Sequence, residues 1–312
     1  MPILPFDDAA VAGAAGLIAA GQIVALPTET VYGLAADAGS AEAVARIYAA
    51  KGRPSFNPLI VHVPDVAAAR RLAVFDAQAE ALASAFWPGP LTLVLPLRGD
   101  AGLAPAVTAG LDTVALRVPA HRAMRAVLAA CDRPLAAPSA NRSGAISPTT
   151  AAHVAASLGD AVPLILDDGA CPAGVESTIV AGAEVLRPGP ITVAMIEAVC
   201  SRAGGSPVAR SGPRRGGTVV TAPGQLDSHY APAKPLRLNA TAADRDEWLI
   251  GFGPVAGDDT LSARGDPTEA AARLFAALHR ADASGKRRIA VAPVPSDGIG
   301  AAINDRLTRA AH

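Results

Sequence analysis

An ammonium and a guanidinium stand two residues apart in Lys51-Gly-Arg53, just before an apolar run that begins at Leu59. Lysine offers a point charge and arginine a bidentate fork, so this pair on a loop suits a polyphosphate. Compensation of a helix dipole would be the simpler explanation. It does not explain a lysine here, because only three of the 27 basic residues are lysines and the other 24 are arginines. We therefore favour a phosphate-binding role.

Hydroxyl and amide residues beside proline and glycine follow several apolar, strand-like runs. Any one of these segments alone would be an ordinary turn, because such residues dominate turns. Their joint occurrence favours one ligand site, since ligands on an open α/β sheet bind where strands end. Hydroxyls and backbone N–H groups in such turns can bind phosphate oxygens. The segments are 27–34, 138–144, 176–178 and 187–190.

Two apolar strand-like runs each contain one polar residue, His62 and Arg117. A lone histidine in a strand is usually a core residue with its hydrogen bonds satisfied. A buried guanidinium without an anion is too costly, so Arg117 requires a carboxylate. The sequence leaves open whether the protein or a ligand supplies it.

Several familiar catalytic patterns are absent from the sequence. It contains no P-loop, no nucleophile elbow and no H-E-x-x-H motif, and its six histidines lack zinc-ligand spacing. Cys131, Cys171 and Cys200 are too widely spaced for a cysteine metal site or a disulfide framework. A cationic, hydroxyl-rich pocket without a nucleophile favours catalysis by positioning and charge stabilisation.

Alternating helix-like and strand-like segments predict the scaffold, an α/β domain built on one twisted, open, mixed sheet with flanking helices. Gly-, Pro- and Ser-rich composition then predicts a linker, followed by a smaller C-terminal α/β domain. The expected division is 1–202, 203–234 and 235–312. Expected helices cover 7–20, 40–50, 65–72, 76–86, 121–130, 149–157, 192–201, 267–283 and 298–310, and expected strands 22–27, 58–63, 91–96, 113–118, 134–138, 163–167, 177–180, 184–187, 247–252 and 287–293.

Composition narrows the class of protein. Hydrophobic residues make up 51% of 312 residues, and the formal net charge is −1. Near-neutral charge argues against a nucleic-acid coat protein. No apolar run approaches the roughly 20 residues of a membrane span, and the first residues lack a basic signal-peptide region. We expect a cytoplasmic protein that does not associate with membranes.

Taken in order, the motifs resemble the YrdC-type threonylcarbamoyl-AMP synthase family in its two-domain form. The matching segments are 26–34, 51–63, 86–92, 117–119, 137–141, 176–180 and 187–189, and less specifically 223–235 and 298–307. The resemblance implies a YrdC-like fold and a nucleotidyltransferase that converts L-threonine, bicarbonate and ATP to threonylcarbamoyl-AMP and pyrophosphate. The product would pass to separate machinery that modifies the adenosine beside the tRNA anticodon, so direct tRNA binding is not required.

The resemblance also implies roles for individual residues. Lys51 and Arg53 would be catalytic, with Lys51 near bicarbonate and the phosphates. Arg117 would pair with the carboxylate of threonine, whereas Ala137 could offer the amino acid only its backbone. Residues implied to bind L-threonine are Thr30, His62, Arg117 and Ser177; those implied to bind ATP are Arg53, Asn57, Thr113, Ser139, Ser147, Arg187 and Tyr230.

The anionic reactants require Mg²⁺ and fixed cations to suppress their repulsion. We expect phosphates and water to hold the Mg²⁺, because the motifs contain no paired aspartates. Glu29 and Glu176 are the nearest acidic candidates, and both could instead be structural anchors. The linker, which carries His229 and Tyr230, is either a lid over the cavity or a plain tether.

Two other functions use the same features. An RNA-binding module could place phosphates in the positive cavity, but the net charge and the lack of interleaved aromatic and basic residues count against it. A different carbamoyl-transfer enzyme on this fold would carry zinc-finger or acyl-phosphatase segments, which the sequence lacks.

Overall fold

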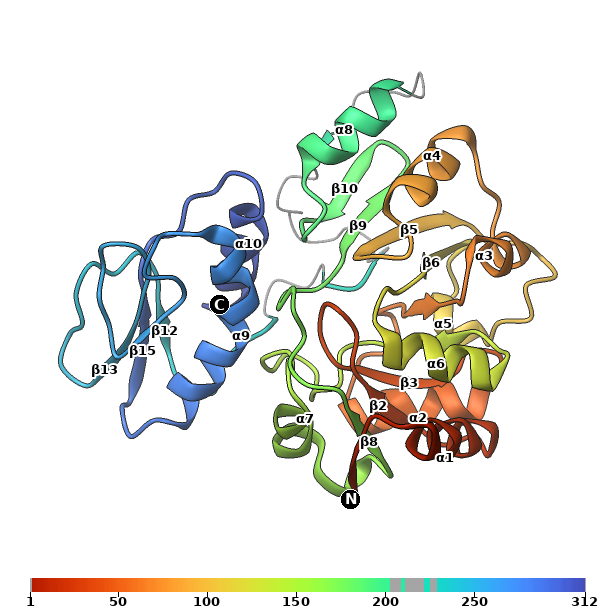
Figure 1. Ribbon diagram of the computed structural model, residues 1–312, viewed down its shortest axis with the longest axis horizontal. Coiled ribbons are helices and arrows are strands. Elements are labelled where there is room, and N and C mark those ends of the chain that lie inside the picture. Colours follow the sequence, from red (N-terminus) through yellow and green to blue (C-terminus); the bar gives the residue numbers. More distant parts are fainter. Residues whose placement is uncertain (1, 203–208, 211–221, 225–228, 312) are drawn as a thin grey trace.

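The computed structural model describes residues 2–202, 209–210, 222–224 and 229–311. The chain forms two bodies (Figure 1). One core of buried apolar side chains lies within the larger body, and a second lies mainly in the smaller body but also includes Val31, Ile146 and Val175 of the larger one. The larger body contains the elements up to β11 and the smaller one contains β12 to α10. Helices α9 and α10 lie on the side of the smaller body that faces the larger one, with its sheet behind them.

The larger body is built on one mixed sheet, whose eleven described strands run in the order β1-β8-β2-β3-β7-β4-β6-β5-β9-β10-β11. Parallel pairs such as β4–β6 and β5–β9 alternate with antiparallel pairs such as β5–β6. The strands are β1 (Ile3–Pro5), β2 (Val24–Leu26), β3 (Gly33–Asp37), β4 (Ile60–His62), β5 (Leu91–Pro96), β6 (Thr113–Arg117), β7 (Leu135–Ala136), β8 (Ile165–Asp167), β9 (Thr178–Ala181), β10 (Glu184–Arg187) and β11 (Ala209–Arg210).

Neighbouring strand residues point to opposite faces of the sheet. Both faces carry buried apolar side chains, and helices cover both of them. Leu26 and Leu135 pack with α1 and α6, whereas Ala25 and Ala136 pack with the core under α2, α3 and α4. The helices are α1 (Asp8–Ala19), α2 (Ala41–Lys51), α3 (Val66–Leu72), α4 (Ala77–Phe86), α5 (Pro105–Thr108), α6 (Arg122–Cys131), α7 (Ala151–Leu158) and α8 (Val193–Arg202).

The end of α2 determines where the Lys51–Arg53 pair lies. Ser40 caps the helix start, its hydroxyl accepting a hydrogen bond from the Ala43 N–H. Gly52 ends the helix in the left-handed conformation, with φ of 59°, which a residue without a Cβ adopts at little cost. This turn keeps Lys51 on the last helical position and starts the loop that carries Arg53.

The smaller body has a parallel four-stranded sheet with the order β12-β15-β13-β14. Its apolar core includes Leu274 and Phe275 of α9, Ile289 of β15 and Ile303 of α10. The elements are β12 (Leu236–Arg237), β13 (Glu247–Gly251), β14 (Asp259–Thr260), α9 (Pro267–Ala283), β15 (Arg288–Val291) and α10 (Gly300–Ala310).

The predicted fold class, a mixed α/β sheet with helices followed by a smaller α/β domain, is confirmed. Sequence analysis missed the short elements β1, β3, α5, β11, β12 and β14, which are two to five residues long. The predicted division at 202 and 234 stays a prediction, and most of the predicted linker and lid, 203–208, 211–221 and 225–228, lies outside the described residues. None of the described helices is both long and apolar enough to cross a bilayer.

Candidate active site

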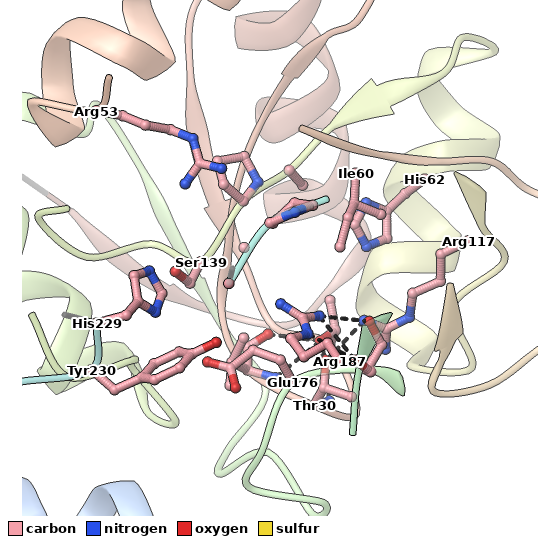
Figure 2. A pocket seen from close by; sticks show the side chains of 18 residues that line it. Thr30, Arg53, Ile60, His62, Arg117, Ser139, Glu176, Arg187, His229 and Tyr230 are labelled. Carbon is pink, nitrogen blue, oxygen red and sulfur yellow. Dashed lines mark hydrogen bonds between the residues drawn. The ribbon is translucent and has the colours of Figure 1, made fainter. Parts of the chain in front are cut away.

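Side chains from distant parts of the chain line one pocket at the carboxyl ends of β2, β4, β6, β7 and β10. The free space in the pocket is about 40 Å³, so it is narrow. Figure 2 shows Arg53, Arg117 and Arg187 around this space, with Tyr230 and His229 on the opposite side from His62. The lining residues are Thr28, Thr30, Val31, Gly33, Arg53, Ile60, His62, Arg117, Ala137, Pro138, Ser139, Glu176, Ser177, Arg187, Pro223, Gly224, His229 and Tyr230.

Arg53 enters the pocket from the loop after α2. Its Nε donates to the Asn57 carbonyl at 3.2 Å and its Nη2 to the Pro58 carbonyl at 2.9 Å. Burial lowers the pKa of Arg53 to about 10, so the guanidinium is charged but poorly solvated. An anion in the pocket would supply the charge partner that these two carbonyls do not.

Lys51 does not line the pocket but lies behind the lining residue Ser139. Its side chain is 3% exposed, and Nζ donates to the Ser139 and Asn141 carbonyls, both at 2.5 Å. Burial, with a contribution from the Arg53 charge, holds the pKa of Lys51 well below its ordinary value. Lys51 therefore ties the 138–144 loop to α2 and places the backbone of the lining residue Ser139.

Arg117 has a carboxylate partner within the protein, which the sequence left undecided. Its Nη2 lies 2.7 Å from Glu29 Oε1, and its Nη1 donates to Thr30 Oγ1 at 2.9 Å. Glu29 also accepts hydrogen bonds from the Ala120 and His121 N–H groups. A substrate carboxylate on Arg117 would thus be a second anion beside Glu29, and not the sole partner that the family resemblance implied.

The Glu29–Arg117 pair makes stability depend on pH. Burial raises the pKa of Glu29, but the Arg117 charge and the hydrogen bonds outweigh it and leave that pKa below its ordinary value. The stabilisation that the ion pair contributes is therefore complete above about pH 4.3, the pKa of glutamate in the unfolded chain, and is lost as pH falls through the lower pKa of the folded state.

We expect Glu29→Gln to destabilise the protein by about 3 kcal/mol at pH 7, because Arg117 would stay buried and unpaired. Urea denaturation of both proteins should show this gap closing below pH 4, and a gap independent of pH would contradict the assignment.

His62 and Arg117 are neighbours across β4 and β6, which pair in parallel with these two residues in register. Burial, with the nearby Arg117 charge, lowers the pKa of His62 to about 3. The imidazole is therefore neutral at pH 7. It adds a hydrogen-bonding group to the Arg117 side of the pocket without adding charge.

Ser177 and Arg187 form a hydrogen-bonded unit. Arg187 donates from Nη2 to the Ser177 carbonyl at 2.9 Å and to Ser177 Oγ at 3.1 Å, and from Nε to the same carbonyl at 3.1 Å. Ser177 Oγ also lies 2.7 Å from Thr92 Oγ1. Burial lowers the pKa of Arg187, which has neutral oxygens as its hydrogen-bond partners here. Its charge is thus available to an anionic ligand.

Three predicted ATP-binding residues do not line the pocket. Ser147 donates to Glu176 Oε1 at 2.5 Å, behind the wall. Asn57 is fully buried, and both its amide atoms lack a hydrogen-bond partner within the described residues. Thr113 begins β6, at the opposite end of that strand from Arg117. Their predicted roles stay predictions.

Acidic groups near the pocket are already paired, Glu29 with Arg117 and Glu176 with Arg306. Across the described parts of the chain, no three His, Cys, Asp or Glu side chains gather to hold a metal ion. This donor set fits a cation carried in by phosphates and water better than one caged by side chains.

Sequence reasoning missed Arg306, which approaches Glu176 from α10, about 130 positions along the chain. No local pattern could have revealed this contact, because it depends on how the two bodies dock. Thr28, Pro223 and Gly224 were also not proposed as site residues. Thr28 could have been proposed from the sequence, since it lies two residues before Thr30 in the hydroxyl-rich segment 27–34. In the structure its Oγ1 lies 2.8 Å from Thr30 Oγ1.

Family models match both bodies. The model described as "Telomere recombination", Sua5_yciO_yrdC, matches residues 16–189. The model described as "Threonylcarbamoyl-AMP synthase, C-terminal domain" matches residues 191–312. Together they cover most of the chain.

Similar proteins match over nearly their full length. The threonylcarbamoyl-AMP synthase of Bacillus subtilis is 40% identical, over 99% of this chain and 94% of its own. That of Pyrococcus abyssi is 39% identical, over 95% and 92%. Among solved structures, P. abyssi Sua5 complexed with L-threonine superposes with a TM-score of 0.90 at 36% identity, covering all of this chain and 98% of that one. The chain belongs to the threonylcarbamoyl-AMP synthase family.

Proposed function

We propose that this protein joins L-threonine, bicarbonate and MgATP into L-threonylcarbamoyl-AMP and releases pyrophosphate. One observation carries the proposal: three buried guanidiniums, those of Arg53, Arg117 and Arg187, come from separate segments and line a single pocket. A pocket with so many buried cations suits a set of anionic reactants.

Threonine would bind on the Arg117 side. Its carboxylate would face the guanidinium, which keeps N–H donors beyond those used by Glu29 and Thr30. Thr30, His62 and Ser177 would surround the rest of the amino acid. The P. abyssi structure, solved with L-threonine, supports an amino-acid site in this fold.

ATP would bind on the opposite side, against Arg53, Ser139, Arg187 and Tyr230. Mg²⁺ would arrive with the nucleotide, held by phosphates and water, and would neutralise charge that builds up as pyrophosphate leaves. Asn57 would contribute if a ligand reached its amide, which has no partner among the described residues, whereas Ser147 would act through Glu176. Thr113 has the weakest structural support of the predicted ATP contacts.

The chemistry needs no protein nucleophile. The deprotonated amine of threonine attacks the bicarbonate carbon and forms a C–N bond. The C–OH bond of bicarbonate breaks, and its hydroxyl leaves as water after taking one proton from the amine, which gives a carbamate. A carbamate oxygen then attacks the α-phosphorus, and the bond to pyrophosphate breaks. Arg53 and Arg187 would hold the phosphates in line, and Lys51, behind Ser139, would add positive charge close to the reacting anions.

The free space of about 40 Å³ would hold about three waters, which is less than the reactants need, and we propose that the pocket widens as they bind. Pro223, Gly224, His229 and Tyr230 form the side of the wall that comes from beyond α8. We propose that these residues move aside for ATP and then cover it. A covered site would also keep water from the labile mixed anhydride.

The product is an activated acyl-adenylate, so its consumer must transfer the threonylcarbamoyl group to a nucleophile. We propose that the acceptor is the adenosine beside the anticodon of tRNA, reached through separate transferase machinery. Direct contact between this chain and tRNA is not required for that step.

Pyrophosphate release tests the proposed reaction. The protein is incubated with MgATP, threonine and bicarbonate, and each reactant is omitted in turn in degassed buffer. We expect release only in the complete mixture, and ¹³C-bicarbonate should label the nucleotide product detected by mass spectrometry. Pyrophosphate that forms without threonine and without bicarbonate would reject the proposal.

A further inference from the structure

Arg306, on α10 of the smaller body, is fully buried against the back of the pocket. Its Nε donates to Glu176 Oε2 at 2.8 Å, and its Nη1 lies 2.7 Å from the Oδ2 of Asp305. Its guanidinium carbon also lies 5.2 Å from the centre of the Tyr230 ring, within the range of a cation–π contact. Arg306 thus touches two residues that line the pocket, Glu176 and Tyr230.

Glu176 depends on this contact. The carboxylate is 6% exposed, and its described side-chain partners are Arg306 and Ser147. Burial raises the pKa of Glu176, but the Arg306 and Arg187 charges outweigh it and hold that pKa below its usual range. A buried carboxylate that loses such a partner must rotate or take up a proton. Rotation would move the part of the pocket wall that Glu176 forms, and protonation would remove its charge there.

Tyr230 is clamped by the smaller body. It is fully buried at a positive φ of 63°, a strained conformation for a residue with a Cβ, which persists only when the surroundings enforce it. Phe275 of α9 packs 5.7 Å from its ring centre. The preceding His229 N–H donates to the Arg309 carbonyl of α10 at 3.2 Å, whereas the following Ala231 N–H donates to the Gly144 carbonyl of the larger body at 2.8 Å.

The Arg117 side of the pocket is held differently. Arg117 is fixed by Glu29 and Thr30, and Ser177 is fixed by Thr92 and Arg187, all within the larger body. A change at Arg306 leaves these contacts in place. The two sides of the pocket are thus supported by different parts of the chain.

We propose that Arg306 is a positioning residue: through Glu176 and Tyr230 it fixes the nucleotide side of the pocket, so that the C-terminal body completes the active site. The proposal rests on the proposed function for its kinetic consequence. The physical clamp on Tyr230 is a separate consequence that can be measured without catalysis.

The test compares Arg306→Met, which removes the charge, with Arg306→Lys, which keeps it. We expect Arg306→Met to lower kcat/KM for ATP about 100-fold, as for a misplaced binding wall, while KM for threonine changes less than about threefold. The kcat/KM for ATP of Arg306→Lys should be about tenfold higher than that of Arg306→Met, since lysine restores a cation to Glu176 but not the planar contact with Tyr230. The control is Arg273→Met, because Arg273 pairs with Asp259 and Glu269 inside the smaller body, away from the pocket.

Hydrogen exchange supplies the readout that a general loss of stability would not produce. In Arg306→Met, the amides of His229 and Ala231 should lose protection, while amides in β4 and β6 keep theirs. If Arg306→Met does not fold, the same comparison is made on Arg306→Lys, which should show the smaller effect in the same places.

Unchanged ATP kinetics in a folded variant, equal losses for ATP and threonine, or unchanged exchange at His229 and Ala231 would each overturn the proposal. Failure of the wild-type protein to release pyrophosphate would reject the proposed function instead. The exchange experiment would still decide whether Arg306 clamps Tyr230.

Discussion

Replacing Lys51 with methionine should lower the turnover of threonylcarbamoyl-AMP synthesis about 1,000-fold, the upper range for loss of one electrostatic contact in a closed site. The substitution removes a cation from beside Arg53 and leaves the carbonyls of Ser139 and Asn141 without their donor. Because burial depresses the pKa of Lys51 in the free protein, binding of the anionic reactants should favour its protonated form. The measurement is the rate of pyrophosphate release at saturating reactants.

Two further variants separate the charge of Lys51 from its hydrogen bonds. Lys51→Gln keeps an N–H donor for the carbonyls but has no charge, and we expect it to be nearly as inactive as Lys51→Met. Lys234→Met is a matched control, because Lys234 Nζ also donates to backbone carbonyls, but those of Ala281 and Ser284 at the end of α9 in the smaller body. Normal turnover in Lys51→Gln would show that Lys51 acts only through its hydrogen bonds to the two carbonyls and that its charge is not needed.

Replacing Arg187 with methionine should reduce kcat/KM for ATP about 1,000-fold, in the range found when a guanidinium that serves phosphoryl transfer is removed. Arg187 presents a buried charge to the pocket and also holds Ser177 through three hydrogen bonds. Its surroundings are tight, since a Cβ on Gly224 would lie 2.9 Å from both Arg187 Cδ and Tyr230 Oη. Steady-state kinetics with ATP as the varied reactant measures the effect.

Arg187→Lys distinguishes charge from shape. A lysine keeps the cation but cannot form the same pair of hydrogen bonds with Ser177. We therefore expect its kcat/KM for ATP to be about tenfold higher than that of Arg187→Met. Arg70→Met serves as the control, because Arg70 forms a bidentate contact with Glu80 on the surface. An Arg187→Met enzyme with normal kcat/KM for ATP would mean that this guanidinium does not bind the nucleotide.

Much of the scaffold could be predicted from sequence, because long amphipathic helices and apolar strands leave clear patterns. The helix that ends at Lys51 and the strand that ends at His62 are examples. β3 was missed because Gly33-Leu-Ala-Ala-Asp37 has neither β-branched residues nor alternation, and it becomes a strand through its pairing with β2 and β7.

The positions of Arg117 and Arg187, the last residues of β6 and β10, follow from a rule that sequence can use, since ligands bind where strands end on such sheets. Arg53 comes instead from the loop after α2. The partner of Arg117 could not be predicted, because Glu29 reaches the end of β6 from the loop after β2, and the path of that loop depends on tertiary packing. The position of Lys51 behind the wall depends on the left-handed turn at Gly52 and on the packing of the 138–144 loop. Such contacts are set by three-dimensional packing and leave no periodic signal.

A crystal structure with threonine and a non-hydrolysable ATP analogue tests the central claim most directly. The account predicts the phosphate chain between Arg53 and Arg187 and the threonine carboxylate at Arg117 beside Glu29, with Tyr230 against the nucleotide. Nucleotide bound elsewhere, for example at the exposed arginines Arg287 and Arg288 of the smaller body, with the pocket still closed, would contradict it.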